Sequence, residues 1–360
     1  MKILTIAGTR PELIRLSVII KKLDKKLNGP DSDPLSKHIF VWTGQNYTPE
    51  LKDIFFEELG IREPDYSNPG GWDGLSSQLG DIFKLVEKAI RECKPDKALI
   101  LGDTNSALST LICERYGVPV YHMEAGNRCH DMKVPEEVNR RNIDHTASYA
   151  LPYTPGATEN LLKEGIPRGR IFECGNPIYE VMMSVGADIS HGHAMDPYFL
   201  ATFHRQENVD NKERLGKIIK SLHMISEKYG AEVICSVHPR TRSRLDMFEI
   251  EVDDSRVKLM NPVGFKEFLE LERMAKGVLT DSGTVQEECC LFHVPTVTIR
   301  DSTERPETVA CGSNLVSGLE PESILACMQE MLKRNRNWHV PGSYGIPNVS
   351  ERVLEILDVR

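Results

Sequence analysis

The 360-residue sequence lacks any apolar stretch that approaches the roughly 20 residues needed to span a bilayer. The apolar run at its start is too short for a secretion signal, because it breaks at Gly8 and charged residues follow. A formal net charge of −9 leaves no dominant basic face, which argues against nonspecific binding to nucleic acid or to a membrane surface. Nine cysteines without CxxC spacing favour reduced thiols over a disulfide framework or a zinc site. We therefore expect a soluble, cytoplasmic protein without nucleic-acid or membrane partners.

Several common cofactor and nucleophile motifs are absent as well. No GxGxxG follows the first apolar run, and GxxxxGK[ST] occurs nowhere. No supporting motif accompanies a Ser-His-Asp or a Cys-His nucleophile. We expect neither a dinucleotide cofactor nor a resident metal.

The sequence does contain a regular alternation of short apolar runs and helical patterns. Because these runs are apolar on both faces and are followed by helices, they predict parallel strands covered by helices. The series restarts after residue 175, which predicts an α/β protein of two doubly wound domains, in keeping with the chain length. The predicted strands lie at 2–8, 38–44, 97–103, 118–126 and 147–154, and then at 198–204, 232–239, 257–262, 277–283 and 295–300.

The domain boundary is predicted within 175–197, where periodicity is lost and Gly, His, Ser and Pro gather. We assign 1–178 to the first domain and 179–345 to the second, followed by a final helix within 346–360. Polar clusters follow nearly every predicted strand, at the end where parallel sheets form their ligand crevice. Two such crevices facing one another would make one site in a cleft.

Two of these clusters suit an anion. "GTRPE" (8–12) ends the first strand and opens a helix, whose exposed N–H groups can hold a phosphate with help from Arg10 and Arg15. The alternative is an ordinary turn with solvated arginines. "LTDSGTVQEE" (279–288) makes a second small polar turn into a helix, and its acids either accept hydrogen bonds from a ribose or compensate the helix dipole. The candidates in this turn are Ser282, Gly283, Thr284, Glu287 and Glu288. Arg300 and Arg305 follow the next strand in "RDSTERPE" (300–307), where either could clamp the same anion or form a surface salt bridge.

Acidic side chains gather after two of the predicted strands. Asp103 stands at a strand end, where a carboxylate serves as a helix N-cap, a catalytic acid or, least favoured here, a metal ligand. Glu124 takes the same position one strand later, and Glu136 opens the next helix. Clustered carboxylates raise one another's pKa and cost stability, which favours a functional cluster. A structural network along the helix face of Glu136, Asn139 and Arg140 is the alternative.

The second domain contributes two histidines at strand ends. His204 and Arg205 lie in "FHRQEN" (203–208), and His238 lies in "VHPRTR" (237–242). A lone histidine is more often a structural partner, but at this position it also suits a general acid or a partner of a leaving phosphate. Together the residues indicate a cleft enzyme, with carboxylates for proton transfer on one domain and a nucleotide-diphosphate cradle on the other.

Seven of these motifs, in order and spacing, resemble the non-hydrolysing UDP-N-acetylglucosamine 2-epimerase family. They are "GTRPE", "GDTNS", "HMEAGNR", "VPEEVNRR", "FHRQEN", "LTDSGTVQEE" and "STERPE". The resemblance implies a glycosyltransferase-B-like fold of two Rossmann-type domains, no cofactor, a homodimer, and a C-terminal helix that returns to the N-terminal domain.

The resemblance also implies a chemistry. A carboxylate removes the C2 proton of a UDP-activated 2-acetamido sugar while UDP leaves from C1, and UDP adds back after C2 is reprotonated on the opposite face. Carried over by motif, the catalytic candidates are Asp103, Glu124, Glu136 and His204. The UDP-binding candidates are Arg10, Arg15, His238, Phe268, Ser282, Gly283, Thr284, Glu288 and Arg305. The sugar-pocket candidates are Arg128, Asn139, Arg140 and Arg205.

Local variants favour one branch of that family. "GNRCHD", "HPRTR" and "SYGIPNVSERV" look closer to the enzymes that epimerise UDP-2-acetamido-2,6-dideoxy-L-talose to UDP-N-acetyl-L-fucosamine. The alternatives are a UDP-GlcNAc/UDP-ManNAc 2-epimerase of the same family and a glycosyltransferase of the same architecture. A transferase needs no pair of acids across C2, so the three carboxylates favour epimerisation.

Overall fold

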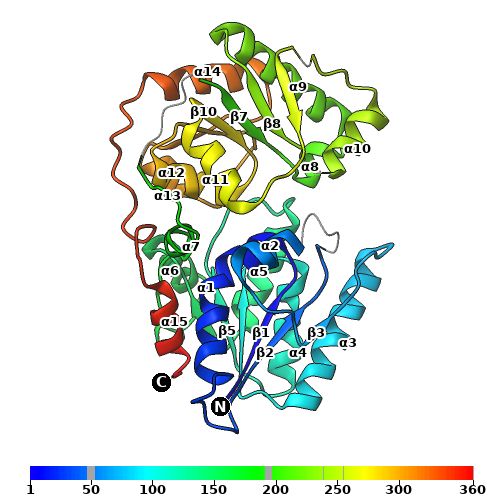
Figure 1. Cartoon of the computed structure of the whole chain (residues 1–360), viewed down its shortest axis with the longest axis vertical. Coiled ribbons are helices and arrows are strands. Elements are labelled where there is room, and N and C mark those ends of the chain that lie inside the picture. The colour runs from blue at the N-terminus through cyan, green and yellow to red at the C-terminus, as the bar shows by residue number, and fades with distance from the viewer. Residues whose placement is uncertain (47–52, 191–196, 238, 254, 360) are drawn as a thin grey trace. The chain divides into compact units, whose positions relative to one another are not determined.

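The computed structural model describes residues 1–46, 53–190, 197–237, 239–253 and 255–359 (Figure 1). The chain divides into two compact units, Met1–Val185 with Ile346–Arg360, and Gly186–Gly345. Each unit is a parallel sheet with helices, so the predicted fold class is confirmed. The division falls after helix α7 (Ile178–Ser184) rather than before it, because α7 packs against helix α1 (Arg10–Leu27) of the first unit.

The described residues of the first unit form a six-stranded sheet in the order β3-β2-β1-β4-β5-β6. All neighbours are parallel, and Leu101 of β4 lies opposite Met123 of β5. The strand order reverses between β1 and β4, which is where an open sheet of this kind forms its crevice. The strands are β1 (Lys2–Ala7), β2 (Lys37–Trp42), β3 (Tyr66–Ser67), β4 (Lys97–Leu101), β5 (Val120–Met123) and β6 (Tyr149–Leu151).

The helices of the first unit lie between these strands and after the last of them. They are α1, α2 (Asp53–Leu59), α3 (Leu75–Cys93), η2 (Asn105–Ser109), α4 (Thr110–Arg115), α5 (Pro135–Thr146), α6 (Pro155–Lys163), η3 (Arg168–Arg170) and α7. Helix α15 (Val349–Ile356) also belongs here and lies beside α1 (Figure 1). Lys22 of α1 pairs with Glu351 of α15 at 2.7 Å, and the Ser350 amide donates to Glu180 of α7 at 2.8 Å.

The described residues of the second unit form another six-stranded parallel sheet, in the order β12-β11-β10-β7-β8-β9. Counted from its own first strand, this is the winding order of the first unit, with the reversal between β7 and β10. The strands are β7 (Phe199–Thr202), β8 (Val233–Ser236), β9 (Val257–Met260), β10 (Gly277–Thr280), β11 (Thr296–Thr298) and β12 (Asn314–Val316). The helices are α8 (Gln206–Val209), α9 (Lys212–Tyr229), α10 (Pro239–Phe248), α11 (Phe265–Met274), α12 (Gly283–Phe292), α13 (Pro306–Ala310) and α14 (Pro321–Lys333).

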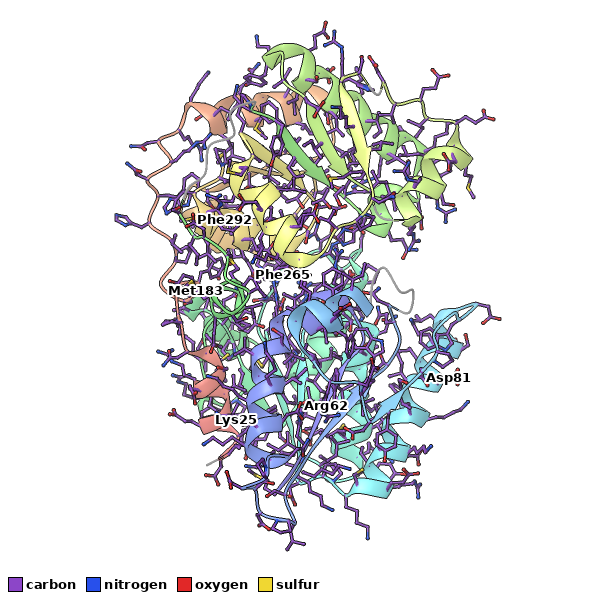
Figure 2. All side chains as sticks on the ribbon, in the orientation of Figure 1. Lys25, Arg62, Asp81, Met183, Phe265 and Phe292 are labelled. Carbon is purple, nitrogen blue, oxygen red and sulfur yellow. The ribbon has the colours of Figure 1, made fainter. Side chains whose placement is uncertain are left out.

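The sequence periodicity and the packing agree in both units. Strand β1 is buried from Ile3 to Ala7, as a strand covered on both faces must be. Phe265 of α11 and Phe292 of α12 are buried (Figure 2). The short edge strands β3 and β12 were not among the predicted strands, because two or three residues carry no periodicity. In the part of the chain that the structure describes, no helix is long and apolar enough to cross a membrane.

Candidate active site

The turn from β1 into α1 is built around one buried carboxyl. Oε2 of Glu12 accepts hydrogen bonds from the amides of Gly8 and Thr9 at 2.7 and 2.8 Å, and Oε1 accepts from the Thr104 hydroxyl beyond β4. The Glu12 side chain therefore bridges the two strands at which the order reverses. Burial raises the pKa of Glu12 to about 7, although these hydrogen bonds act in the opposite direction.

Gly8 is required in this turn by space rather than by conformation. A Cβ at Gly8 would stand 1.8 Å from Oγ1 of Thr43 and 2.3 Å from Oγ of Ser106. These two buried hydroxyls are hydrogen-bonded to each other at 2.7 Å. The predicted anion turn thus packs directly against side chains of the sheet's carboxyl end. Arg10 begins α1, with its amide donating to Oδ1 of Asn46 at 2.8 Å and its guanidinium 5.4 Å from the Phe55 ring centre.

Glu124 follows β5 in an unusual backbone conformation. Its φ of +66° lies in the left-handed region, and a residue other than glycine adopts this backbone conformation at a cost of order 1–3 kcal/mol. Its carboxylate forms a buried ion pair with Arg15 of α1 and lies 3.3 Å from the Asn127 amide group. Strain of this kind persists where the surroundings fix it and gathers at functional sites. The structure therefore unites the predicted residues Glu124 and Arg15 in one buried pair.

Asp103 follows the neighbouring strand β4 and has a partner of its own. Its carboxylate pairs with Arg140 of α5 at 2.7 Å, and its carbonyl oxygen accepts from the Asn139 side chain at 2.9 Å. The Asp103 side chain retains about a fifth of its exposure. Because Leu101 and Met123 are paired in register, Asp103 and Glu124 leave the sheet at the same edge on adjacent strands. Glu136, at the start of α5, is partly buried.

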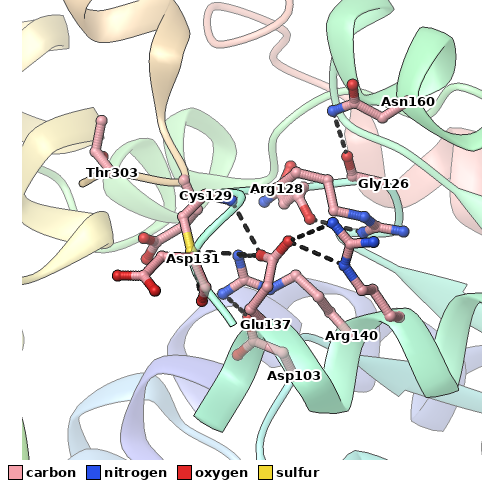
Figure 3. Close-up of polar contacts among 12 residues, drawn as sticks. Asp103, Gly126, Arg128, Cys129, Asp131, Glu137, Arg140, Asn160 and Thr303 are labelled. Carbon is pink, nitrogen blue, oxygen red and sulfur yellow. Dashed lines mark hydrogen bonds and ion pairs between the residues drawn. The ribbon is translucent and has the colours of Figure 1, made fainter. Parts of the chain in front are cut away.

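Glu137, an acid in the first turn of α5, is buried and holds this region together (Figure 3). Its carboxylate accepts from the Cys129 amide at 3.0 Å and pairs with Arg140 and Arg141, each at 3.1 Å. Burial opposes its ionisation, but the Cys129 amide and the Arg140 charge more than offset it, so the pKa of Glu137 lies below its usual value.

Arg128 was predicted to lie in a sugar pocket, and the structure places it in a buried ion-pair network. Its Nη1 lies 2.7 Å from Asp144, and its Nε donates to Glu164 at 2.9 Å. Nη1 also donates to the Asn127 carbonyl at 2.7 Å. This placement favours a role in positioning the loop after β5 over direct contact with a sugar.

In the second unit, Asp281 organises the ends of β7 and β10. The amides of His204 and Arg205 donate to its buried carboxylate at 3.1 and 2.9 Å, and the Asn208 side chain donates at 3.0 Å. Burial raises the pKa of Asp281, against the effect of these donors. His204 remains about one-third exposed, with Nδ1 3.6 Å from Asp281. Asp281 lies within the "LTDSGTVQEE" segment, but the sequence does not reveal which amides a strand-end aspartate binds.

The remaining second-unit candidates gather around the start of α12. A Cβ at Gly283 would stand 3.0 Å from Oε1 of Glu304 and 3.4 Å from Cζ of Arg305. The same Glu304 oxygen accepts from Arg205 at 2.9 Å, and Arg305 forms an ion pair with Glu287. Arg205, Gly283 and Arg305 thus lie around Glu304, after strands β7, β10 and β11 respectively.

Other candidates of the second unit lie on the flanking helices. Ser282 caps α12, with its amide donating to the Thr280 hydroxyl at 3.0 Å, and Thr284 lies in the first helical turn, partly buried. Glu288 is buried against Glu272 of α11, and its charge helps to raise the pKa of Glu272, for which burial is the main cause. Phe268 of α11 is partly buried. His238 lies outside the described residues.

A metal ion held by the protein needs a group of close His, Cys, Asp or Glu side chains. Among those that the structure describes, no group of three or more His, Cys, Asp or Glu side chains has an arrangement that could hold an ion. What both units present instead is carboxylates paired with arginines, and backbone turns that open helices at the carboxyl ends of strands. Such a set can transfer protons and hold an anionic ligand.

Comparison with known proteins gives this arrangement a family. The family model described as UDP-N-acetylglucosamine 2-epimerase matches residues 31–358. The chain belongs to the UDP-N-acetylglucosamine 2-epimerase family. It is therefore an epimerase, and the resemblance seen in its motifs is confirmed at the level of the family, though not for the L-fucosamine-forming branch.

Relatives in this family match over nearly the whole chain. The UDP-N-acetylglucosamine 2-epimerase of Methanocaldococcus jannaschii is 40% identical, covering 99% of each chain. The UDP-2,3-diacetamido-2,3-dideoxy-D-glucuronate 2-epimerase of Pseudomonas aeruginosa is 36% identical, again over 99% of each. A crystal structure of the M. jannaschii enzyme in complex with UDP-GlcNAc and UDP has a TM-score of 0.91 at 39% identity, covering 99% of both chains.

A more distant likeness concerns the fold alone. A lipopolysaccharide outer core galactosyltransferase has a TM-score of 0.56 at 12% identity, covering 99% of both chains. Epimerases of this family and glycosyltransferases of the B type thus share an architecture of two Rossmann-like units, as the motifs implied. Because the shared fold carries many activities, the acids and not the architecture have to decide the chemistry.

Proposed function

We propose that this protein is a cofactor-free 2-epimerase of a UDP-activated 2-acetamido sugar, acting by elimination and re-addition of UDP. The observation that carries the proposal is the pair of carboxylates at the ends of adjacent strands, Glu124 against Arg15 and Asp103 against Arg140. An arginine partner favours the ionised form of a carboxylate, which is the form that accepts a proton. Glu136 is the third candidate acid at this edge.

The proposed reaction balances without a redox group. A carboxylate takes the C2 proton, the C2–H electron pair forms a C1–C2 double bond, and the C1–O bond breaks as UDP leaves. A second acid then protonates C2 from the opposite face, and UDP adds back to C1. Two groups must address opposite faces of one carbon, and this need supports roles for Asp103, Glu124 and Glu136 together.

The UDP moiety is assigned to the second unit. Support comes from the turn into α12 at Ser282 and Gly283, with Arg305 and Arg205 beside it. His204, held at its amide by Asp281 and partly exposed at its ring, is proposed to assist the diphosphate as it leaves.

Two sugars are candidates for the substrate. UDP-GlcNAc, interconverted with UDP-ManNAc, is favoured by the names of relatives about 40% identical. The L-talo sugar, converted to UDP-N-acetyl-L-fucosamine, is favoured by the "GNRCHD" and "SYGIPNVSERV" segments. By the family resemblance we also propose a cytoplasmic homodimer, which light scattering coupled to gel filtration would test.

Exchange of the C2 proton with heavy water tests the reaction. The protein is incubated in D2O with a panel of UDP-2-acetamido sugars and no acceptor, and recovered substrate and product are examined for deuterium at C2. An epimerase incorporates deuterium into both epimers. A glycosyltransferase or a non-catalytic binder leaves C2 unlabelled, and that result would reject the proposal.

Amide variants separate the acids from the pocket. We expect Asp103→Asn and Glu124→Gln each to lower turnover strongly, by 10²-fold or more at the scale typical of general acid–base groups, with UDP affinity within a few-fold. Asp24→Asn is the matched control, because Asp24 pairs with His38 at the amino end of β2. Equal loss of UDP binding in both site variants would mean that these acids build the pocket.

A further inference from the structure

A buried histidine that the proposed reaction does not use lies beneath both strand-end acids. His122 of β5 stands two residues before Glu124 and is fully buried. Its Nδ1 lies 2.8 Å from Oδ1 of Asp144 on α5, and its Nε2 lies 2.8 Å from the carbonyl oxygen of Gly102. Gly102 directly precedes Asp103. The His122 ring therefore contacts the backbone next to Asp103, and His122 itself lies two residues before Glu124.

Both partners of the His122 ring are acceptors. A carbonyl oxygen only accepts, so Nε2 must carry a proton. Asp144 is ionised, because its Oδ2 pairs with Nη1 of Arg128 at 2.7 Å and accepts from the Gly126 amide at 3.0 Å. Nδ1 must then donate as well. Only the imidazolium form donates from both nitrogens.

The other oxygen of Asp144 holds the chain on the far side of Glu124. Oδ2 accepts from the Gly126 amide at 3.0 Å and pairs with Nη1 of Arg128 at 2.7 Å. Asp144 thus binds His122, which precedes Glu124, and both Gly126 and Arg128, which follow it. Glu124 itself keeps the left-handed backbone with a φ of +66°. Contacts on both sides are what allow such a strained residue to persist.

We propose that His122 and Asp144 are positioning residues that fix the spacing of Asp103 and Glu124 through a buried imidazolium–carboxylate pair. The imidazolium ties the end of β4, at Gly102, to the carboxylate that fastens the turn after β5. Both acids must address the same carbon, and a displacement of about 1 Å is enough to cost on the order of 10²-fold in rate. The proposal rests on the proposed function, because it takes Asp103 and Glu124 as the reacting acids.

Substitution of the ring tests the positioning role. In His122→Gln the side chain can donate to only one of the two acceptors, so the link between the strands is broken. We expect kcat to fall about 10–100-fold while KM and the Kd for UDP stay within about threefold. In Asp144→Asn the ring can turn neutral, donate to Gly102 and accept from the new amide, so we expect a smaller loss, below about tenfold.

The double variant supplies a rescue. With His122→Gln and Asp144→Asn together, the Gln oxygen can accept from the Asn amide while the Gln amide still donates to Gly102. The Asn oxygen can still accept from Gly126. We expect the double variant to recover at least about threefold in kcat over His122→Gln alone, which two independent losses of stability would not produce.

The same unit contains a matched control pair. His38 of β2 is also fully buried, with Nδ1 2.7 Å from Oδ1 of Asp24 and Nε2 2.9 Å from the Thr5 hydroxyl. This pair lies at the amino end of the sheet, away from both acids. His38→Gln should lower thermal stability to a similar extent and leave kcat unchanged.

The outcomes separate the inference from the reaction. If the wild type exchanges C2 deuterium, and His122→Gln only loses thermal stability as His38→Gln does while keeping wild-type kcat, the positioning role is rejected. A change in KM with unchanged kcat would reject it too. The protonation of His122 is measured without substrate, by 15N NMR of histidine-labelled protein with the His122→Gln variant for assignment. Because both partners of the ring accept hydrogen bonds, we expect protons on both ring nitrogens, and a ring protonated on only one nitrogen would overturn the inference even if the protein epimerises its substrate.

Discussion

Replacing Gly8 by alanine should destabilise the first unit sharply. The new methyl group would lie 1.8 Å from the Thr43 hydroxyl oxygen and 2.3 Å from that of Ser106. Both side chains are short and buried, so they can move away only by breaking their mutual 2.7 Å hydrogen bond. Overpacking costs about 1–3 kcal/mol and the lost buried hydrogen bond about 1 kcal/mol more. We expect a loss of about 2–4 kcal/mol.

The same chemical change elsewhere in the unit should have the opposite sign. Gly80 lies inside α3, and a Cβ there would meet no heavy atom within 4 Å. Because alanine is the better helix former by about 1 kcal/mol, Gly80→Ala should stabilise the protein slightly. The pair therefore controls for any general effect of removing a glycine.

Thermal and urea-induced unfolding followed by circular dichroism measure both variants. For a unit of this size each kcal/mol corresponds to roughly 2–4 °C, so Gly8→Ala should lower the melting temperature by roughly 5–15 °C. Combining it with Thr43→Ala and Ser106→Ala should recover part of the loss. A Gly8→Ala protein as stable as the wild type would refute the close packing of the β1–α1 turn against the end of the sheet.

Three further results are expected. Gly283→Ala pushes on the side chains beside α12 and should weaken UDP binding about tenfold by calorimetry, whereas Gly216→Ala in α9, with free space for a Cβ, should leave it unchanged. Because the pKa of Glu12 is raised to about 7, the folded protein binds more protons there than the unfolded chain between about pH 4.5 and 7. As the pH rises from about 4.5 to 7, urea titrations should therefore show the unfolding free energy of the wild type falling by up to about 3 kcal/mol relative to that of Glu12→Gln, which mimics the protonated form. If the unfolding free energies of the two proteins change in parallel with pH, the prediction is contradicted. The Cys290 thiol, 3.7 Å from the Cys311 sulfur, lowers the pKa of Cys311, so alkylation at pH 7 should label Cys311 before the other cysteines. Cys290→Ala should slow the alkylation of Cys311, and equal alkylation rates in the variant and the wild type would show that the two thiols are not coupled.

The sequence alone predicts ten of the twelve described strands and the edge where polar residues gather. A buried parallel strand must be apolar on both faces, and this requirement is visible in any single run such as 97–103. The residue after such a run leaves the sheet at its carboxyl end. Asp103, Glu124, His204 and Gly283 could therefore be picked as candidates before any tertiary contact was known.

Tertiary structure decided which charges pair with which. Glu137 reads as one more acid in a first helical turn, yet its carboxylate is buried between two arginines and a loop amide. Arg128 reads as a sugar ligand, yet it pairs with Asp144, 16 residues away in sequence. The local pattern fixes burial and direction along a strand or helix, because those depend on near neighbours. The partner of a charged side chain depends on which distant element packs against it, and only the folded chain supplies that neighbour.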